Sequence, residues 1–538
     1  MNRIFVYLVG VLLGTLLILA MPPARKNMDM KPTAAHHVLT SEQQWFNVSR
    51  PLTPEDLQGR VILIDFWTFC CINCMHVMPD LKKLEAEFGD KLTVIGVHSG
   101  KFFNERDGDM IQSAVLRHEL EHPVVNDAGF SIWKNFGARA WPTLMLIGPL
   151  GKIERVYSGE GHYQDLRADI LHLLEKNEGR VNAQKLPIAL EREKAPSMFF
   201  DFPSKLVYAP DRQFLFVSDT GNHRIIGLDL EGRVKLTIGS GKRGRADGAF
   251  ASAEFQMPQG LLYHNGELFV ADSENHLLRR IDLMTKTVET IAGTGMQGHV
   301  YHVENAPALT TAIATPWDLT RSADGKEIII AMAGTHQLWG YDSANKTLRV
   351  IAGNGMESID DGGYPQNSLS QPSGISRLGD RLYFVDSETS ALRVLEKENI
   401  HTLVGTALFD FGLKDGVGKQ AQMQHPIGIF ADESGIYIAD TYNHAIRRYD
   451  PQTQQLSTLV GNGDAGFVDG DFSKARFNEP NGLVKIGHKL YVTDTNNHQI
   501  RVVDVLQKKV STLYIHVPTD AELITCEDGV CRPRLVKN

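Results

Sequence analysis

Three of the five cysteines in this 538-residue chain fall within five residues, at Cys70, Cys71 and Cys74. Two cysteines separated by two residues can alternate between a dithiol and a disulfide, provided that one thiol ionises readily. The free N–H groups at a helix start favour ionisation, because they stabilise a thiolate. We expect Cys71 at a helix start, where it attacks, and Cys74 one turn later, where it resolves a mixed disulfide and closes a Cys71–Cys74 disulfide.

The cysteine cluster lies between an apolar stretch of strand length, residues 60–67, and an amphipathic stretch of helix length, residues 75–90. The apolar face of this helix carries Val77, Leu81, Leu84 and Phe88. Further strands are expected at 92–99, 143–148 and 151–159, and further helices at 113–121 and 168–176. The alternation of strands and helices predicts an α/β domain with a mixed sheet over residues 41–178.

Other residues of this domain fall at spacings that resemble those of the thioredoxin family. Asp65 lies six residues before Cys71, Pro79 lies five after Cys74, and Trp141-Pro142-Thr143 precedes a strand. The resemblance implies a buried Asp65 that accepts the proton of Cys74, and a cis Pro142 beside the cysteines. It also implies a substrate groove shaped by Trp141 and Thr143, with Cys70 where the family usually has Trp.

Metal and haem chemistry are alternatives for a cysteine cluster. Zinc would need four ligands, and the candidates Cys70, Cys71, Cys74 and His76 include adjacent cysteines, which chelate poorly. A c-type haem needs a histidine directly after the second cysteine, where this chain has Met75. We therefore expect no metal and no cofactor, with redox-silent or structural thiols as the remaining alternative.

After residue 200 the helical pattern gives way to one recurring phrase, such as the stretch from Val217 to Ile225. Its histidine position recurs six times at intervals of 53, 60, 54, 54 and 54 residues, and each copy contains short β-rich runs. The six positions are His223, His276, His336, Ser390, His444 and His498, and a proline precedes each copy. This period predicts a six-bladed β-propeller over residues 201–516. The phrase Asp-x-x-Asn-His resembles the NHL-repeat family.

The repeated aspartates and histidines have a structural interpretation. Aspartate at a turn accepts backbone N–H groups, and a histidine repeated once per blade would tie neighbouring strands together. Some NHL propellers hold a metal and act as lyases, but that would need histidines on the ring axis. Five histidines outside the phrase are expected to be solvated loop residues: His264, His299, His302, His425 and His488.

The two ends of the chain give expectations about location. Ile4 to Ala20 is an uncharged apolar run, which we interpret as an uncleaved anchor within residues 1–21, the alternative being a cleaved signal. Linkers are expected at 22–40 and 179–200, and a tail at 517–538. Cys526 and Cys531 flank an Asp-Gly turn and could form a disulfide, which would indicate an oxidising compartment.

Stretches in both domains, including 67–81 and 257–283, make the chain similar to the NHL repeat-containing protein 2-like family. We interpret it as a membrane-anchored bacterial member: a thiol–disulfide oxidoreductase of the inner membrane, with both domains on the periplasmic side. Expected partners are protein thiols and disulfides, an unknown redox partner, and a protein or small ligand on the propeller. The net charge of −9 and a single basic cluster at 242–245 argue against nucleic acid. The alternatives are a non-catalytic scaffold and, third, a propeller-based metal lyase or hydrolase.

Overall fold

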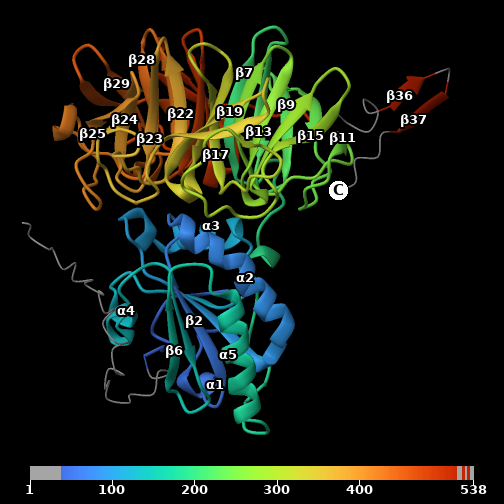
Figure 1. Ribbon diagram of the computed structural model, residues 1–538, viewed down its shortest axis with the longest axis vertical. Coiled ribbons are helices and arrows are strands. Elements are labelled where there is room, and N and C mark those ends of the chain that lie inside the picture. The colour runs from blue at the N-terminus through green and yellow to red at the C-terminus, as the bar shows by residue number, and fades with distance from the viewer. Residues whose placement is uncertain (1–37, 518–523, 528–529, 534–538) are drawn as a thin grey trace, which may run out of the picture.

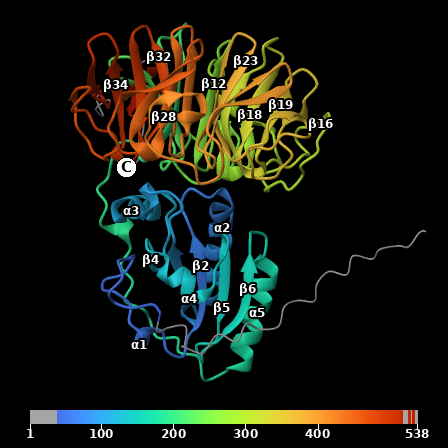
Figure 2. The same ribbon diagram turned by 90° about the vertical axis from the view of Figure 1, so that its left-hand side faces the viewer.

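The computed structural model describes residues 38–517, 524–527 and 530–533, and it contains two stacked domains. An α/β domain lies below a ring of β-sheets, with α2 and α3 against the lower face of the ring in both views (Figures 1 and 2). The predicted α/β domain followed by a six-bladed propeller is therefore confirmed. The predicted anchor, residues 1–21, lies outside the described residues.

The α/β domain is built on a six-stranded mixed sheet in the order β1-β4-β3-β2-β5-β6. Its central strand β2 is parallel to β3 and antiparallel to β5, and all its side chains are buried. The strands are β1 (Trp45–Phe46), β2 (Val61–Trp67), β3 (Leu92–His98), β4 (Val124–Asn126), β5 (Thr143–Ile147) and β6 (Ile153–Ser158). Burial of β2 on both faces explains why its sequence is an unbroken apolar run apart from Asp65.

Helices cover this sheet, and the expected apolar face of α2 is buried against it at Val77, Leu81, Leu84 and Phe88. The helices are α1 (Pro54–Leu57), α2 (Ile72–Phe88), α3 (Gly108–Arg117), α4 (Ser131–Phe136) and α5 (Tyr163–Lys176). The helix predicted at 113–121 is displaced toward the N-terminus. Asp107 caps α3 by accepting from the N–H groups of Asp109 and Met110, and so fixes an earlier start.

The propeller has six antiparallel sheets. The first three blades run from the inside outwards as β7 (Pro203–Ala209), β8 (Phe214–Asp219), β9 (Arg224–Asp229) and β10 (Val234–Ile238); β12 (Pro258–His264), β13 (Glu267–Asp272), β14 (Leu277–Asp282) and β15 (Thr287–Ala292), with β11 (Gly248–Ala249); and β17 (Pro316–Arg321), β18 (Glu327–Met332), β19 (Gln337–Asp342) and β20 (Thr347–Ala352), with β16 (Ala306–Pro307).

The remaining blades repeat this order. They are β22 (Pro372–Leu378), β23 (Arg381–Asp386), β24 (Ala391–Glu396) and β25 (Asn399–Val404), with β21 (Gly362–Gly363); β27 (Gly428–Asp432), β28 (Gly435–Asp440), β29 (Ala445–Asp450) and β30 (Gln455–Val460), with β26 (Gly416–Val417); and β32 (Pro480–Ile486), β33 (Lys489–Asp494), β34 (Gln499–Asp504) and β35 (Lys509–Thr512), with β31 (Gly470–Asp471). The ring closes where Thr495 donates to the carbonyl of Pro203 at 2.7 Å.

In five of the six blades the repeated aspartate holds the blade together from within. Asp272, for example, accepts from the backbone N–H of Gln256 and pairs with the fully buried Arg279 at 2.7 Å. The third blade lacks this pair, and the corresponding positions carry Met332 and Trp339, which lie in one apolar cluster. The ring therefore accepts either a buried ion pair or an apolar pair at this place.

The repeated histidine joins each blade to the next, as predicted. Its ring Nδ1 accepts from the backbone N–H of the residue just before the next blade's proline. His336 Nδ1, for example, accepts from the N–H of Gln371 at 3.0 Å. The same bond joins His223 to Met257, His276 to Thr315, His444 to Glu479 and His498 to Phe202. In the fourth blade the hydroxyl of Ser390 takes this role toward His425.

The glycines of the Pro-x-Gly sequences sit where inner strands of neighbouring blades approach closely. A Cβ on Gly428 would lie 1.7 Å from the carbonyl oxygen of Asn481. The two blades without this glycine carry Lys205 and Asp318 instead, and these two side chains lie 3.5 Å apart. Lys205 also donates to the carbonyl of Ile427 in the fifth blade, so this buried pair spans the middle of the ring.

A short hairpin of β36 (Ile524–Glu527) and β37 (Val530–Pro533) ends the described chain. Its register places Cys526 opposite Cys531, as the turn sequence suggested, while the side chains that would form the disulfide are not described. Across the described residues, none of the helices has the length and apolar character needed to cross a bilayer.

Candidate redox site

The two cysteines lie at the start of α2. Cys71 is the N-cap residue, in an extended conformation, and its carbonyl accepts from the N–H of Cys74 at 3.1 Å and of Met75 at 3.2 Å. Both thiols are free, and Cys71 is close enough to raise the pKa of Cys74. Strand β2 ends at Trp67, and the chain then turns into α2 at Cys71. The two cysteines therefore lie at a helix start, as expected for a redox pair.

A buried carboxyl group lies beneath the pair, as the sequence implied. Burial raises the pKa of Asp65 to about 7, and one of its oxygens, Oδ1, has no hydrogen-bond partner among the described residues. Burial, the hydrogen bond with Cys71 and the charge of Asp65 raise the pKa of Cys74 well above its usual range. Cys74 therefore loses its proton only to a nearby base, and Asp65 is placed to be that base.

His122 is a third buried titratable group here, which sequence reasoning missed. Burial opposes its protonation, but the nearby carboxylates of Glu85 and Asp65 outweigh this and raise the pKa of His122. Its Nδ1 lies 3.3 Å from Glu85, which is partly exposed, and both residues line a surface cleft. No sequence spacing marks His122, because it lies in the loop between α3 and β4, far along the chain from Asp65 in β2.

The loop before β5 completes the site. The Trp141–Pro142 peptide bond is cis, as the resemblance implied. Trp141 packs against the cluster that contains Cys70, Cys71 and Cys74, and its indole donates to the carbonyl of Ser99 at 2.9 Å. Thr143 is buried and donates to the carbonyl of Ala140 instead. Its hydroxyl therefore faces its own loop.

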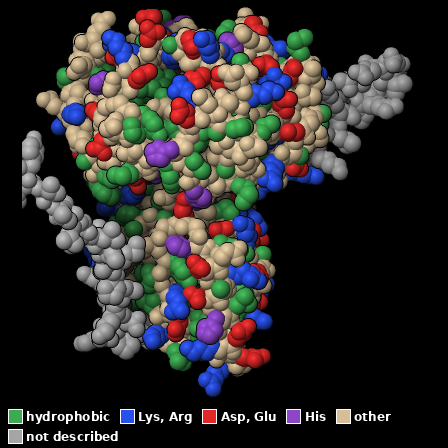
Figure 3. Space-filling model, viewed as in Figure 1, with side chains coloured by type: hydrophobic (Ala, Val, Ile, Leu, Met, Phe, Trp, Pro, Cys, Tyr) green, Lys and Arg blue, Asp and Glu red, His purple; other side chains and the backbone are tan. Residues whose placement is uncertain are grey.

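The propeller covers this site, which sequence analysis did not predict. Cys71 retains only 6% of its surface and Cys74 none. The side-chain amide of Gln371 bonds the backbone on both sides of Cys71: it accepts from Ile72 and donates to the carbonyl of Cys70. The side chains of the two domains meet at a waist in the space-filling view (Figure 3).

The covering face is built from the residues that precede the repeat prolines. Each has a positive φ between 45° and 64°, and each is held by the histidine or serine of the preceding blade. Thr315 bonds His76, Gln371 bonds the cysteine loop, and Glu479 bonds Asn104 and Arg117. His425 packs on Phe102, and Phe202 on Arg117. The position of these residues before each repeat proline can be read from the sequence, but the local sequence does not show which residues of the other domain they contact.

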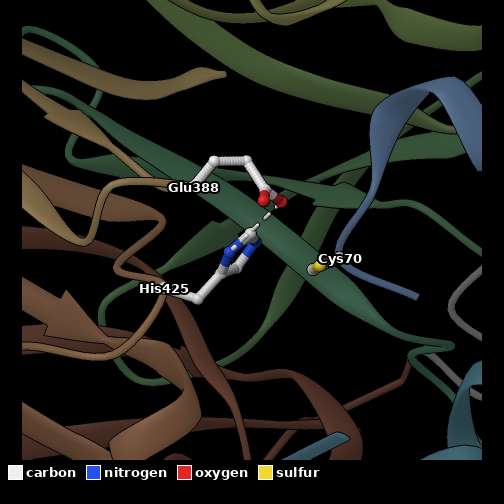
Figure 4. A group of neighbouring side chains, drawn as sticks. All are labelled: Cys70, Glu388 and His425. Carbon is white, nitrogen blue, oxygen red and sulfur yellow. Dashed lines mark ion pairs between the residues drawn. The ribbon is translucent and has the colours of Figure 1, made fainter. Parts of the chain in front are cut away.

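Cys70 points away from the pair. Its sulfur lies within 4.8 Å of ligand atoms of Glu388 and His425, two residues of the propeller (Figure 4). Burial and the charges of Glu105 and Glu388 raise the pKa of its thiol well above the usual range. His425 is 1% exposed, so the expectation that it is a solvated loop residue is wrong. The turn before Pro426 directs its ring toward the other domain.

Comparison with known proteins agrees with the fold. The thioredoxin-like family model matches residues 59–153. A thiol–disulfide oxidoreductase of Bacillus subtilis, YkuV, is 25% identical over 147 residues, which cover 27% of this chain and 93% of that protein. The first domain is thus thioredoxin-like, with distant relatives among thiol–disulfide oxidoreductases, and it is joined to a six-bladed propeller.

Some relatives cover almost the whole chain, including one from an animal and one from a plant. NHL repeat-containing protein 2 of Bos taurus is 38% identical over 527 residues, covering 91% of this chain and 72% of that protein. Protein SUPPRESSOR OF QUENCHING 1, chloroplastic, of Arabidopsis thaliana is 41% identical over 510 residues, covering 90% of this chain and 47% of that protein. The chain belongs to the NHL repeat-containing protein 2 family.

The predicted location in a bacterial inner membrane, with both domains facing the periplasm, is contradicted by these comparisons. The relatives that share about nine-tenths of the chain are animal and plant proteins, and the plant protein is chloroplastic by name. The prediction relied on the apolar run at residues 4–20 and on the possible disulfide between Cys526 and Cys531. An apolar run does not distinguish between membranes or targeting routes.

Proposed function

We propose that the protein is a thiol–disulfide oxidoreductase in which Cys71 attacks, Cys74 resolves and Asp65 takes the proton. The observation that carries this proposal is the position of Cys71 and Cys74 at the start of α2, with the buried carboxyl group of Asp65 in β2 close enough to raise the pKa of Cys74. Trp141 packs against the cluster that contains the pair, and with cis Pro142 it would shape the groove for a substrate. The relatives among thiol–disulfide oxidoreductases support the same reaction class.

The reaction balances without any cofactor. The Cys71 thiolate attacks one sulfur of a substrate disulfide, and the other sulfur leaves as a thiolate, which gives a mixed disulfide. Cys74 then gives its proton to Asp65 and attacks the Cys71 sulfur, releasing the second substrate thiolate. The substrate gains two electrons and the Cys71–Cys74 pair loses them. A redox partner restores the dithiol, and the reverse sequence oxidises a substrate dithiol.

The propeller would act as the scaffold that presents or selects the substrate. Its lower face bonds the backbone around Cys71, and a protein disulfide reaches Cys71 only when this face moves away. We therefore infer that partner binding to the propeller and access to the thiols are linked. The burial of Cys71 also favours the second candidate function, a scaffold whose thiols stay reduced and silent.

A redox titration separates the two functions. The protein would be equilibrated in glutathione buffers, its thiols trapped with an alkylating agent, and the adducts mapped by mass spectrometry. An oxidoreductase should interconvert Cys71 and Cys74 at a potential between roughly −120 and −270 mV. A pair that never cycles, together with full function of a Cys71→Ser variant, would establish the scaffold instead.

A further inference from the structure

A second cluster of reactive side chains lies across the domain boundary, apart from the Cys71–Cys74 pair. Cys70 comes from the loop after β2, Glu388 from the turn between β23 and β24, and His425 from the residue before Pro426. One sulfur, one oxygen and one nitrogen lie within 4.8 Å of one another (Figure 4). The three residues are at most 2% exposed.

Two of these atoms face each other at more than hydrogen-bond distance. Glu388 Oε1 and His425 Nδ1 are 3.9 Å apart, and neither has a hydrogen-bond partner in the described part of the chain. Buried polar atoms left unpaired cost free energy, so natural proteins rarely keep them without a ligand. A cation between them would satisfy both.

The other carboxylate oxygen of Glu388 is already engaged. Lys101 donates to Glu388 Oε2, which leaves Oε1 directed at the cluster. His425 Nδ1 faces this oxygen and has no hydrogen-bond partner among the described residues. A neutral imidazole binds a metal through such a ring nitrogen.

We propose that Cys70, Glu388 and His425 form a binding site for a divalent metal ion such as Zn²⁺, which bridges the two domains. Thiolate, imidazole and carboxylate are all zinc ligands, and three protein ligands leave the fourth position to water or to an incoming group. Cys70 binds as the thiolate and releases its proton to solvent. The site does not depend on exchange at Cys71 and Cys74.

The site has a consequence for the neighbouring pair. A metal held by one residue of the first domain and two of the second would fasten the propeller over Cys71, and release of the metal would favour opening. It would also hold Cys70 on the propeller side, away from the Cys71–Cys74 pair. The earlier expectation of no metal considered only ligands close in sequence, whereas Glu388 and His425 lie more than 300 residues away.

Cobalt titration of the metal-free full chain tests this proposal. We expect one equivalent of Co²⁺ to bind and to produce thiolate-to-cobalt charge-transfer absorption, and Zn²⁺ to displace it. The absorption should persist in a Cys71→Ser/Cys74→Ser variant and disappear in Cys70→Ser. Glu388→Gln/His425→Gln should weaken binding by more than about 100-fold, because outer-shell partners alone are worth roughly 10- to 100-fold.

Glu274→Gln is the matched control, since Glu274 occupies in the second blade the position that Glu388 occupies in the fourth. It should leave metal binding unchanged. Thermal unfolding of each metal-free variant establishes that it is folded. The proposal is overturned if the folded wild-type chain binds no cobalt, or if the absorption is lost in Cys71→Ser/Cys74→Ser and kept in Cys70→Ser.

Discussion

The side-chain amide of Gln371 brackets Cys71, accepting the N–H of Ile72 at 3.1 Å and donating to the carbonyl of Cys70 at 2.9 Å. Ile72 is the first residue of α2, and its N–H is one of the free donors that a thiolate or a substrate backbone would use. A residue of the propeller thus occupies part of the site at which Cys71 would meet a substrate under the proposed function. Access to Cys71 depends on how tightly the two domains are held together.

Replacing Gln371 should therefore expose the attacking cysteine. In Gln371→Ala two hydrogen bonds across the boundary are lost, each worth about 1 kcal/mol, so the open population should rise roughly 10- to 30-fold. Timed alkylation with mass-spectrometric mapping of Cys71 measures this. Gln256→Ala is the control, because Gln256 bonds Glu274 within the second blade. Equal alkylation rates in both variants would refute a closing role for Gln371.

Replacing the buried carboxyl should change the pH dependence of the resolving step. Since the pKa of Asp65 is raised to about 7, the rate in the wild type should rise as the pH passes through 7. Asp65→Asn should flatten this rise and slow the step by at least about 10² above pH 7. Stopped-flow measurement of mixed-disulfide decay between pH 5 and 9 tests it, and an unchanged profile would remove Asp65 from the mechanism.

The same substitution should stabilise the fold at neutral and higher pH. A folded-state pKa raised from 3.8 to about 7 gives stability that is present below pH 3.8 and lost as the pH rises to 7. The loss is about 4 kcal/mol at most, and Asp65→Asn should avoid it. Urea unfolding should show a larger free energy of unfolding for the variant than for the wild type at pH 8, and no such difference at pH 4.

The buried ion pair of the fourth blade should be costly to break singly. Asp386 and Arg393 are 2.9 Å apart and fully buried, so Arg393→Met should destabilise by about 3–5 kcal/mol because it leaves a charge without a partner. Asp386→Asn/Arg393→Met removes both charges and should cost about 2 kcal/mol less than the two single changes added together. Strict additivity in urea unfolding would show that the pair is not coupled.

The glycine at the inner edge of the fifth blade should not tolerate a side chain. Gly428→Ala places a Cβ 1.7 Å from the Asn481 carbonyl oxygen, so the inner strands must separate, at a cost of about 3 kcal/mol or more. Gly129→Ala is the control, because a Cβ there has no neighbour among the described residues within 4 Å. Equal melting temperatures of the two variants would contradict the close approach of the blades.

The sequence determined the local features of this protein. The apolar run ending at Trp67 fixes strand β2, and Asp65 is buried because it lies within this strand. The two-residue spacing places Cys71 and Cys74 on the first turn of α2. The period of about 54 residues predicts six blades, since a repeat that cannot bury its faces alone must stack and close. These features depend on residues that are near each other in the chain.

The tertiary structure alone decided how the two domains meet. Gln371 reaches Cys70 across 301 residues of chain, and His425 and Glu388 converge on the same cysteine. No local pattern encodes such contacts, because a histidine before a proline looks the same whether it faces solvent or another domain. The fold brings one residue of each blade to a single face, and packing of that face against the first domain places ordinary loop residues around Cys70 and Cys71.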